Sequence, residues 1–212
     1  MNDYILISGT RVLMPTEWEK LREAMVTPNQ QLRAKEALES GNTSKANQIL
    51  RYQIMCDMKL QTGMRDVEIR SMTRDWYRAS RRVIVLPKGA CKKERCTYTE
   101  RTVMLSLPGC DAVDRYLSSG CTIPEDSTTT RDALRRYAEK AGIGTEGITP
   151  KMFRKTLASW LMACFPEQEM YISASMGHSR EVLQRHYLGL GFPKGEYELI
   201  RNKYLVEWGK RL

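Results

Sequence analysis

Two β-rich segments in an otherwise helix-patterned chain limit the folds open to this sequence. The segments "RRVIVLPKG" (81–89) and "ERTVMLSLP" (100–108) are rich in β-branched and large apolar residues, which favour strands. The connecting stretch "KGACKKERCTYTE" (88–100) contains glycine and several lysines and is typical of a long hairpin loop. The sequence therefore predicts one small antiparallel sheet within a mostly helical domain, which is an α+β fold.

Apolar residues recur at helical spacing along most of the remaining chain. Gly63 is a natural stop for the helix before it, and the polar stretch 27–48 contains the helix-breaking "ESGNTS". Neither an internal repeat nor a long low-complexity linker is found, so we expect one domain. The predicted helices cover residues 14–25, 46–62, 65–72, 111–119, 131–144, 150–164, 166–176, 180–188 and 195–212.

The net charge indicates a polyanionic partner. Lys and Arg number 34 against 25 Asp and Glu, which gives a net charge of +9 over 212 residues. Such an excess favours nucleic acid first and an anionic membrane second, although a basic protein with no such partner is the alternative. The N-terminus has no basic segment followed by an apolar run, and no apolar stretch approaches the ~18 residues of a membrane span. These features predict a cytoplasmic protein with no membrane partner.

The six cysteines are scattered along the chain without the spacing of a disulfide-stapled secreted module. We therefore expect reduced thiols in an intracellular protein. Cys91 and Cys96 flank "KKER", but a single pair without a second one is a weak indication of zinc. The sequence predicts neither a metal site nor a cofactor.

Two cations lie at the predicted start of the helix 150–164. Thr149 is a good N-cap and Pro150 a good first residue, so Lys151 and Arg154 fall in the first turns. The helix dipole disfavours cations at this end, and no acid nearby in sequence pairs with them. A bound phosphate would stabilise both side chains. The alternative is that both extend into water.

Both histidines of the chain lie in "GHSREVLQRHY" (177–187). Gly177 is expected to end one helix and Ser179 to cap the next, which places His178 in the joint. Tyr187 follows His178 by nine residues, near the end of the second helix. A chemical role for this pair competes with a simpler one, in which a buried tyrosine and a joint histidine only support the fold.

A third group of candidate residues lies near the predicted hairpin and before it. Arg65 lies in the tight connection "TGMRDVEI" (62–69), and Glu68 follows one turn later, where it could orient the guanidinium. An ordinary surface ion pair is the alternative. Lys88 lies at the mouth of the hairpin and could deliver an ammonium group to a substrate. Lys92 and Lys93 are rivals for that role.

The order of these motifs resembles the catalytic domain of the tyrosine recombinases, the phage-type integrase family, over nearly the whole chain. The similar blocks are "LMPTEWEKL", "TGMRDVEI", the hairpin lysine, "AEKAGIGTEGITPKMFRKTLASWL" and "SASMGHSREVLQRHY". The resemblance implies the mostly helical DNA breaking-rejoining fold with a small antiparallel sheet. It also implies a site-specific recombinase (integrase) that needs neither metal nor ATP.

The resemblance also implies roles for the candidate residues. Tyr187 would attack the scissile phosphate and form a 3′-phosphotyrosine intermediate. Arg65, Arg154 and Lys151 would supply cations to the transition state. His178 would donate a hydrogen bond to a phosphate oxygen or assist Tyr187, and the sequence leaves both roles open.

The remaining roles belong to the hairpin and to the acid beside the first arginine. Lys88 is the preferred general acid, over Lys92 and Lys93, because a lysine ahead of glycine is the family's usual arrangement. Glu68 would hold Arg65. Lys151 stands where most members of the family carry histidine, a trait of some archaeal viral integrases, which favours such an origin.

The resemblance implies a domain plan and an assembly. Residues 1–194 would form the catalytic domain, and 195–212 would form a C-terminal helix that protomers exchange or that docks on its own domain. We expect no counterpart here of the family's N-terminal core-binding domain, and both a fragment and a minimal form of the family stay open. The expected partners are double-stranded DNA attachment sites in the nucleoid, with a homo-tetramer on DNA and a monomer when free. The competing functions are DNA relaxation like that of a type IB topoisomerase, or a catalytically silent DNA-binding module.

Overall fold

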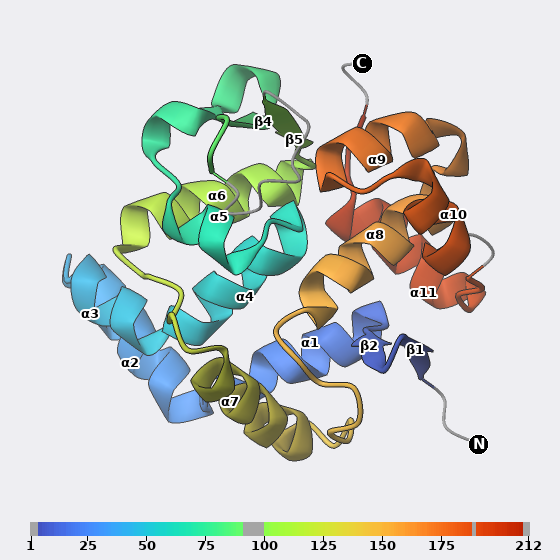
Figure 1. The fold of residues 1–212 in the computed structure, drawn as a ribbon. Coiled ribbons are helices and arrows are strands. Elements are labelled where there is room, and N and C mark those ends of the chain that lie inside the picture. Colours follow the sequence, from blue (N-terminus) through green and yellow to red (C-terminus); the bar gives the residue numbers. More distant parts are fainter. Residues whose placement is uncertain (1–3, 91–99, 188–189, 210–212) are drawn as a thin grey trace.

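The fold is seen in a computed structural model that describes residues 4–90, 100–187 and 190–209 (Figure 1). Lys92, Lys93, Cys91 and Cys96 lie outside these residues, so the predictions made for them are not addressed by the structure.

The predicted hairpin is present and belongs to a three-stranded antiparallel sheet. The strands β4 (Val83–Leu86) and β5 (Arg101–Met104) pair directly, and the short β3 (Tyr77–Arg78) lies on the other side of β4. A second sheet, of two strands, forms near the N-terminus from β1 (Ile5–Ile7) and β2 (Thr10–Val12). The prediction of a mostly helical chain with a small antiparallel sheet is therefore confirmed.

Helices make up most of the described chain. Three short 3₁₀ segments lie between them, at 74–76, 79–81 and 166–168, and a π turn, Ile200–Tyr204, follows the last helix. The helices are α1 (Pro15–Ala24), α2 (Pro28–Glu39), α3 (Thr43–Ile49), α4 (Arg51–Thr62), α5 (Asp66–Arg70), α6 (Leu107–Ser119), α7 (Ser127–Lys140), α8 (Met152–Cys164), α9 (Glu169–Met176), α10 (Arg180–Tyr187) and α11 (Lys194–Leu199).

Two polar stretches are more helical than the sequence pattern indicates. Residues 27–48 contain α2 and most of α3, and the predicted break between them is found at 40–42. The helix α7 begins at Ser127, ahead of the predicted residue 131, because the Asp126 carboxylate accepts hydrogen bonds from the backbone N–H groups of Thr128 and Thr129. Side-chain capping outweighs the low helix propensity of the threonines that follow.

Two hydrophobic cores flank the central helix α4. The first core lies around α8 and includes Trp18, Phe153, Trp160 and Ile200 with Cys56 and Leu60 of α4. The second core lies under the three-stranded sheet, where Ile54, Met55 and Met58 of α4 meet Ile84, Val103 and Val113. Figure 1 shows α4 between the elements of the two cores, with β4, β5 and α6 on one side and α1 and α8 on the other.

The helix α8 is buried on nearly all sides. Four side chains along the helix lie in the first core: Phe153, Leu157, Trp160 and Cys164. The Trp160 indole N–H donates to the Leu13 carbonyl at 3.0 Å, and the Thr156 hydroxyl accepts from the Leu13 N–H at 2.9 Å. These bonds tie α8 to the residue that follows β2.

The start of α8 differs from the prediction. Lys151 occupies the N-cap position and α8 begins at Met152, whereas Thr149 was expected to be the cap. The Met152 N–H bonds to the Thr149 carbonyl at 3.0 Å, so residues 149–151 form a turn that leads into the helix. Arg154 therefore lies within the first turn, and the Lys151 side chain is exposed.

The C-terminal segment packs on its own domain in this structure. Helix α11 is shorter than the predicted 195–212, and the chain continues as the π turn. Tyr204, Leu205 and Trp208 lie in the first core. Arg82 forms an ion pair with Glu207 at 2.6 Å, which joins this segment to the region of the three-stranded sheet. This packing corresponds to the alternative in which the segment docks on its own domain.

Candidate active site

Arg65 is held at the corner between α4 and α5. Gly63 ends α4 in the left-handed conformation, with φ of 59°, where a residue with a side chain would be strained. Arg65 is the N-cap of α5, and the Glu68 carboxylate accepts from its backbone N–H and from its Nη1, both at 2.8 Å. Because the Glu68 side chain is 0% exposed, the alternative of an ordinary surface pair is wrong.

Arg154 reaches from α8 to the same corner. Its Nη1 donates to the Gly63 carbonyl at 2.5 Å, and its Nη2 donates to the Met176 carbonyl at the end of α9. Burial, followed by the positive charges of Arg65 and Arg101, lowers the pKa of Arg154. The alternative in which Arg154 extends into water is therefore wrong.

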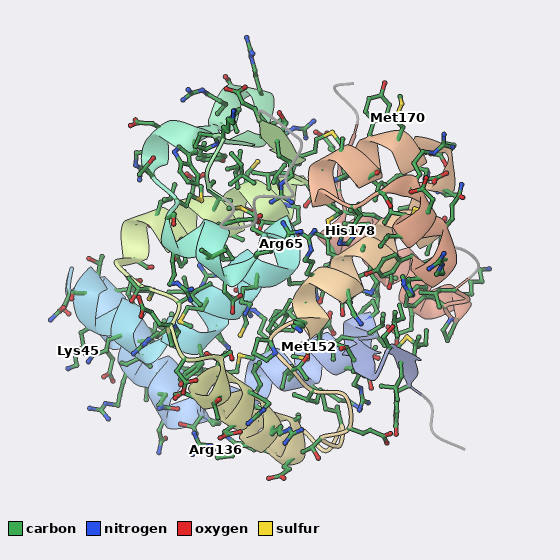
Figure 2. The ribbon with its side chains drawn as sticks, viewed as in Figure 1. Lys45, Arg65, Arg136, Met152, Met170 and His178 are labelled. Carbon is green, nitrogen blue, oxygen red and sulfur yellow. The ribbon has the colours of Figure 1, made fainter. Side chains whose placement is uncertain are left out.

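His178 and Tyr187 meet at the joint between α9 and α10. Gly177 ends α9 with φ of 60°, and the rings of His178 and Tyr187 are nearly parallel, with centroids 6.1 Å apart. Tyr187 is only 5% exposed and belongs to the first core. Burial raises the pKa of its hydroxyl, and the charge of Arg154 acts in the opposite direction. In Figure 2, Arg65 and His178 lie close together in the view, between α5 and the end of α9.

The structure adds one cation that the sequence interpretation missed. Arg101 begins β5, opposite Leu86 of β4, and its side chain is 9% exposed. Its Nη2 lies 2.5 Å from a Glu68 carboxylate oxygen, and its Nη1 lies 2.7 Å from the Met176 carbonyl oxygen. The available signal was an arginine at the start of a strand that follows the hairpin loop. Such a residue is common on surfaces and gave no reason to select it.

Two predicted site residues are not joined to this cluster by any contact. Lys88 is exposed in the turn after β4, and Lys151 is exposed at the start of α8. Within the described part of the chain, neither side chain forms a hydrogen bond or ion pair with Arg65, Arg154 or His178. The structure thus brings together Arg65, Glu68, Arg154, His178 and Tyr187, and leaves the two lysines outside the group.

The cluster carries an excess of positive charge. Among the described residues, three guanidinium groups, those of Arg65, Arg101 and Arg154, surround one carboxylate, that of Glu68. Buried like charges are unfavourable unless a counter-ion is bound. Of the two arginines paired with Glu68, Arg65 is the more accessible, with its side chain 41% exposed against 9% for Arg101. The arrangement is therefore suited to bind an anion beside Tyr187.

Burial and the positive cluster together favour the neutral form of His178. Burial, and then the charges of Arg154, Arg65 and Arg101, lower the pKa of His178 to about 3. The imidazole is therefore neutral near pH 7. Its Nδ1 is buried and has no hydrogen-bond partner among the described residues.

This depressed pKa predicts a pH dependence of stability. Between about pH 6.5, the ordinary value for histidine, and about pH 3, the unfolded chain binds a proton at His178 that the folded chain does not. The free energy of unfolding should therefore fall as the pH is lowered through this window, by up to about 1.4 kcal/mol per pH unit from this group. Urea unfolding of the wild type and of His178→Gln at several pH values measures the effect. The difference between the two proteins should change with pH, and a constant difference would contradict the lowered pKa.

Two properties of the described residues bear on ligands and location. No group of three or more His, Cys, Asp or Glu side chains among them is placed to hold a metal ion. None of the helices described in the structure is long and apolar enough to cross a membrane.

Comparison with known proteins identifies the family. The model of the phage integrase family matches residues 25–190, a range that contains the whole cluster around Tyr187. The chain therefore belongs to the phage integrase family, whose members are tyrosine recombinases. No curated protein matches the sequence.

Solved structures agree with this assignment at the level of the fold. A crystal structure of XerA recombinase is 20% identical with a TM-score of 0.55, and the match covers 90% of this chain and 64% of that one. Two structures of the Tn1549 transposon integrase, one with circular intermediate DNA and one with transposon right end DNA, have TM-scores of 0.53 and 0.51 and are 15% and 16% identical. Each of these matches covers 82% of this chain, and 65% or 64% of the integrase chain. The chain thus spans somewhat less than two thirds of the length of these relatives.

Proposed function

We propose that this protein is a site-specific DNA recombinase that cuts and rejoins DNA strands through a covalent tyrosine–phosphate intermediate. The observation that supports the proposal is the meeting of Arg65, Arg154 and a neutral His178 beside Tyr187, in a member of the phage integrase family. The Tn1549 integrase structures were solved in complex with DNA, which supports double-stranded DNA as the partner here.

The proposed first step is a transesterification at one scissile phosphate. The Tyr187 oxygen forms a bond to phosphorus, and the bond from phosphorus to the 5′ oxygen breaks. The tyrosine gives up its proton and the leaving 5′ oxygen gains one, so the products are a 3′-phosphotyrosine and a free 5′ hydroxyl. The phosphodiester energy is kept in the covalent link. Attack by a 5′ hydroxyl of another strand reverses the step and completes recombination.

The cations would stabilise the charge that develops on the phosphate oxygens. Arg65 and Arg154 offer guanidinium groups fixed by protein contacts before DNA binds, and fixed donors are effective because they need no reorganisation during the reaction. Lys151 would add an ammonium group from the exposed start of α8. We expect these cations to make a metal ion unnecessary.

His178 and Lys88 would each act on a different oxygen of the scissile phosphodiester. A pKa lowered to about 3 makes His178 a weak base in the free protein, so we assign it the role of hydrogen-bond donor to a phosphate oxygen. Lys88 would protonate the leaving 5′ oxygen, with Lys92 and Lys93 as rivals. Glu68 would hold Arg65 in place.

We further propose that the reaction takes place in a homo-tetramer on two duplexes, with a monomer in the absence of DNA. The segment 195–212 would leave its own domain and dock on a neighbouring protomer in that assembly. The recombination reaction would take place in the cytoplasm, on DNA of the nucleoid.

A covalent-capture experiment tests this function. The protein is mixed with a pool of nicked duplexes of randomised sequence in EDTA, and SDS-resistant protein–DNA adducts are isolated and sequenced. We expect adducts with the wild type and none with Tyr187→Phe. Since Phe fills the same position in the first core, the variant should keep its fold and its DNA binding, and it loses only the attacking hydroxyl.

The outcomes separate the candidate functions. Binding without any adduct would indicate the silent DNA-binding module, and an adduct that survives Tyr187→Phe would place the nucleophile elsewhere, with Tyr171 and Tyr197 next to be tested. Recombination and DNA relaxation are then distinguished with two labelled duplexes that carry the captured sequence. A recombinase joins strands of one duplex to strands of the other, whereas a topoisomerase-like enzyme reseals each strand to itself.

A further inference from the structure

Arg101 contacts two of the segments that surround the cationic site. Through Nη2 it reaches the Glu68 carboxylate on α5, and through Nη1 it reaches the Met176 carbonyl at the end of α9. Among the described residues, no other side chain hydrogen-bonds to both of these acceptors. Arg101 therefore connects α5 to the corner that precedes His178.

Each acceptor of Arg101 is shared with another arginine. Glu68 also accepts from the Arg65 backbone N–H and Nη1, and the Met176 carbonyl also accepts from Arg154. If Arg101 moved, Glu68 would keep Arg65 but lose Arg101 as a partner. The Met176 carbonyl would keep only the bond from Arg154 out of these two. The positions of Arg65 and Arg154 are thus linked through the contacts of Arg101.

The corner at Gly177 is built against the Arg101 side chain. A Cβ atom at Gly177 would lie 2.8 Å from Arg101 Cδ and 2.9 Å from its Nη1, and the residue has φ of 60°. The same strand holds α9 a second time, since the Met104 N–H donates to the Ser175 hydroxyl at 3.0 Å. The strand β5 therefore fixes the position of the joint between α9 and α10. His178 lies in this joint, beside the ring of Tyr187.

We propose that Arg101 is a positioning residue for DNA cleavage, which sets the separation between Arg65 and the His178 corner by bridging Glu68 and the Met176 carbonyl. The proposal rests on the proposed function of the site. Direct contact with the phosphate is the competing role. The geometry favours positioning, because the side chain of Arg101 is 9% exposed whereas that of Arg65 is 41% exposed.

The test compares Arg101→Met, Arg101→Lys and the wild type on a duplex recovered by covalent capture. With Arg101→Met we expect the single-turnover rate of adduct formation to fall about 100-fold, the size of effect that a misplacement of about 1 Å produces, with DNA affinity nearly unchanged. Arg101→Lys keeps the charge but has no fork to bridge two acceptors, so its rate should lie between the other two.

A second substrate distinguishes positioning from a merely structural role. In a methylphosphonate, a methyl group replaces one non-bridging oxygen and the scissile group is neutral, so aligned cations matter less to the transition state. The deficit of Arg101→Met relative to the wild type should therefore shrink at least about tenfold on this substrate. An equal deficit on both substrates, or no deficit on either, would overturn the proposal.

Arg82→Met is the matched control for the loss of a buried arginine. Arg82 is 7% exposed and pairs with Glu207, which is not one of the described partners of Arg101. We expect both Arg82→Met and Arg101→Met to lower the melting temperature of the protein. The rate of adduct formation by Arg82→Met should stay close to that of the wild type. If the wild type itself forms no adduct, the proposed function and this inference both fail. If the wild type reacts and Arg101→Met reacts equally fast, only this inference fails.

Discussion

Arg154→Met should abolish most DNA cleavage while leaving the protein folded. Arg154 is the partly buried guanidinium that links the Gly63 and Met176 carbonyls, and removal of one preorganised donor to a developing negative charge typically lowers a rate by about 10²–10³-fold. We expect a loss of at least that size in the single-turnover rate of adduct formation.

The stability of the same variant should change little, because two effects oppose each other. The Gly63 carbonyl loses its bond from Arg154, which costs about 1–3 kcal/mol if it is left unsatisfied, whereas the Met176 carbonyl keeps its bond from Arg101. Removal of one positive charge from beside Arg65 and Arg101 relieves repulsion in the absence of DNA. Urea unfolding and the cleavage rate together test this separation. Arg154→Lys serves as the control that keeps a positive charge, and full activity of Arg154→Met would remove Arg154 from the site.

Glu68→Gln should show the opposite pattern, with a large loss of stability. The Glu68 carboxylate is 0% exposed and forms ion pairs with Arg65 and Arg101. The amide keeps the size of the side chain but removes the negative charge that, in the described part of the chain, pairs with Arg65 and Arg101. Breaking a buried ion pair from one side typically costs about 3–5 kcal/mol. We expect a loss of about 3 kcal/mol in the free energy of unfolding, together with slower cleavage because Arg65 is no longer held.

Glu39→Gln is the control for this change. Its carboxylate is 65% exposed and lies 3.9 Å from Lys35 on α2, and exposed pairs contribute little to stability. Thermal or urea unfolding of both variants should show a clear loss for Glu68→Gln and almost none for Glu39→Gln. Equal effects would mean that Glu68 is not the organising charge of the cluster.

The sequence predicted the elements of the fold better than their ends. The hairpin and most helices were expected because apolar periodicity reports which face of a segment is buried. The start of α7 was misplaced because the Asp126 cap acts through hydrogen bonds that the periodicity does not record. The start of α8 was misplaced because Thr149 lies in a preceding turn, where its hydroxyl is buried and does not cap the helix.

The candidate site was predicted in part, and the missed portion has a physical cause. Arg65, Arg154, His178 and Tyr187 were selected because each lies in a local pattern that resembles a family motif. Arg101 lies in no such pattern, and its importance depends on contacts with residues 33 and 75 positions away in the chain. Contacts at that separation are decided by how α5, β5 and α9 pack, which a single sequence does not report.

The burial of α4 between two cores limits how this protein can be divided. The second core contains Met64, the neighbour of Arg65, whereas Tyr187 belongs to the first core. Tyr187 and Arg65, which the proposed reaction would use together, therefore lie on opposite sides of α4. In a chimaera of two relatives with its junction next to α4, this helix would come from one parent only. Its side chains would then fit the core from that parent and not the core from the other. Segments can thus be exchanged between relatives only at the surface of this fold. A substitution in α4 must fit the side chains of both cores.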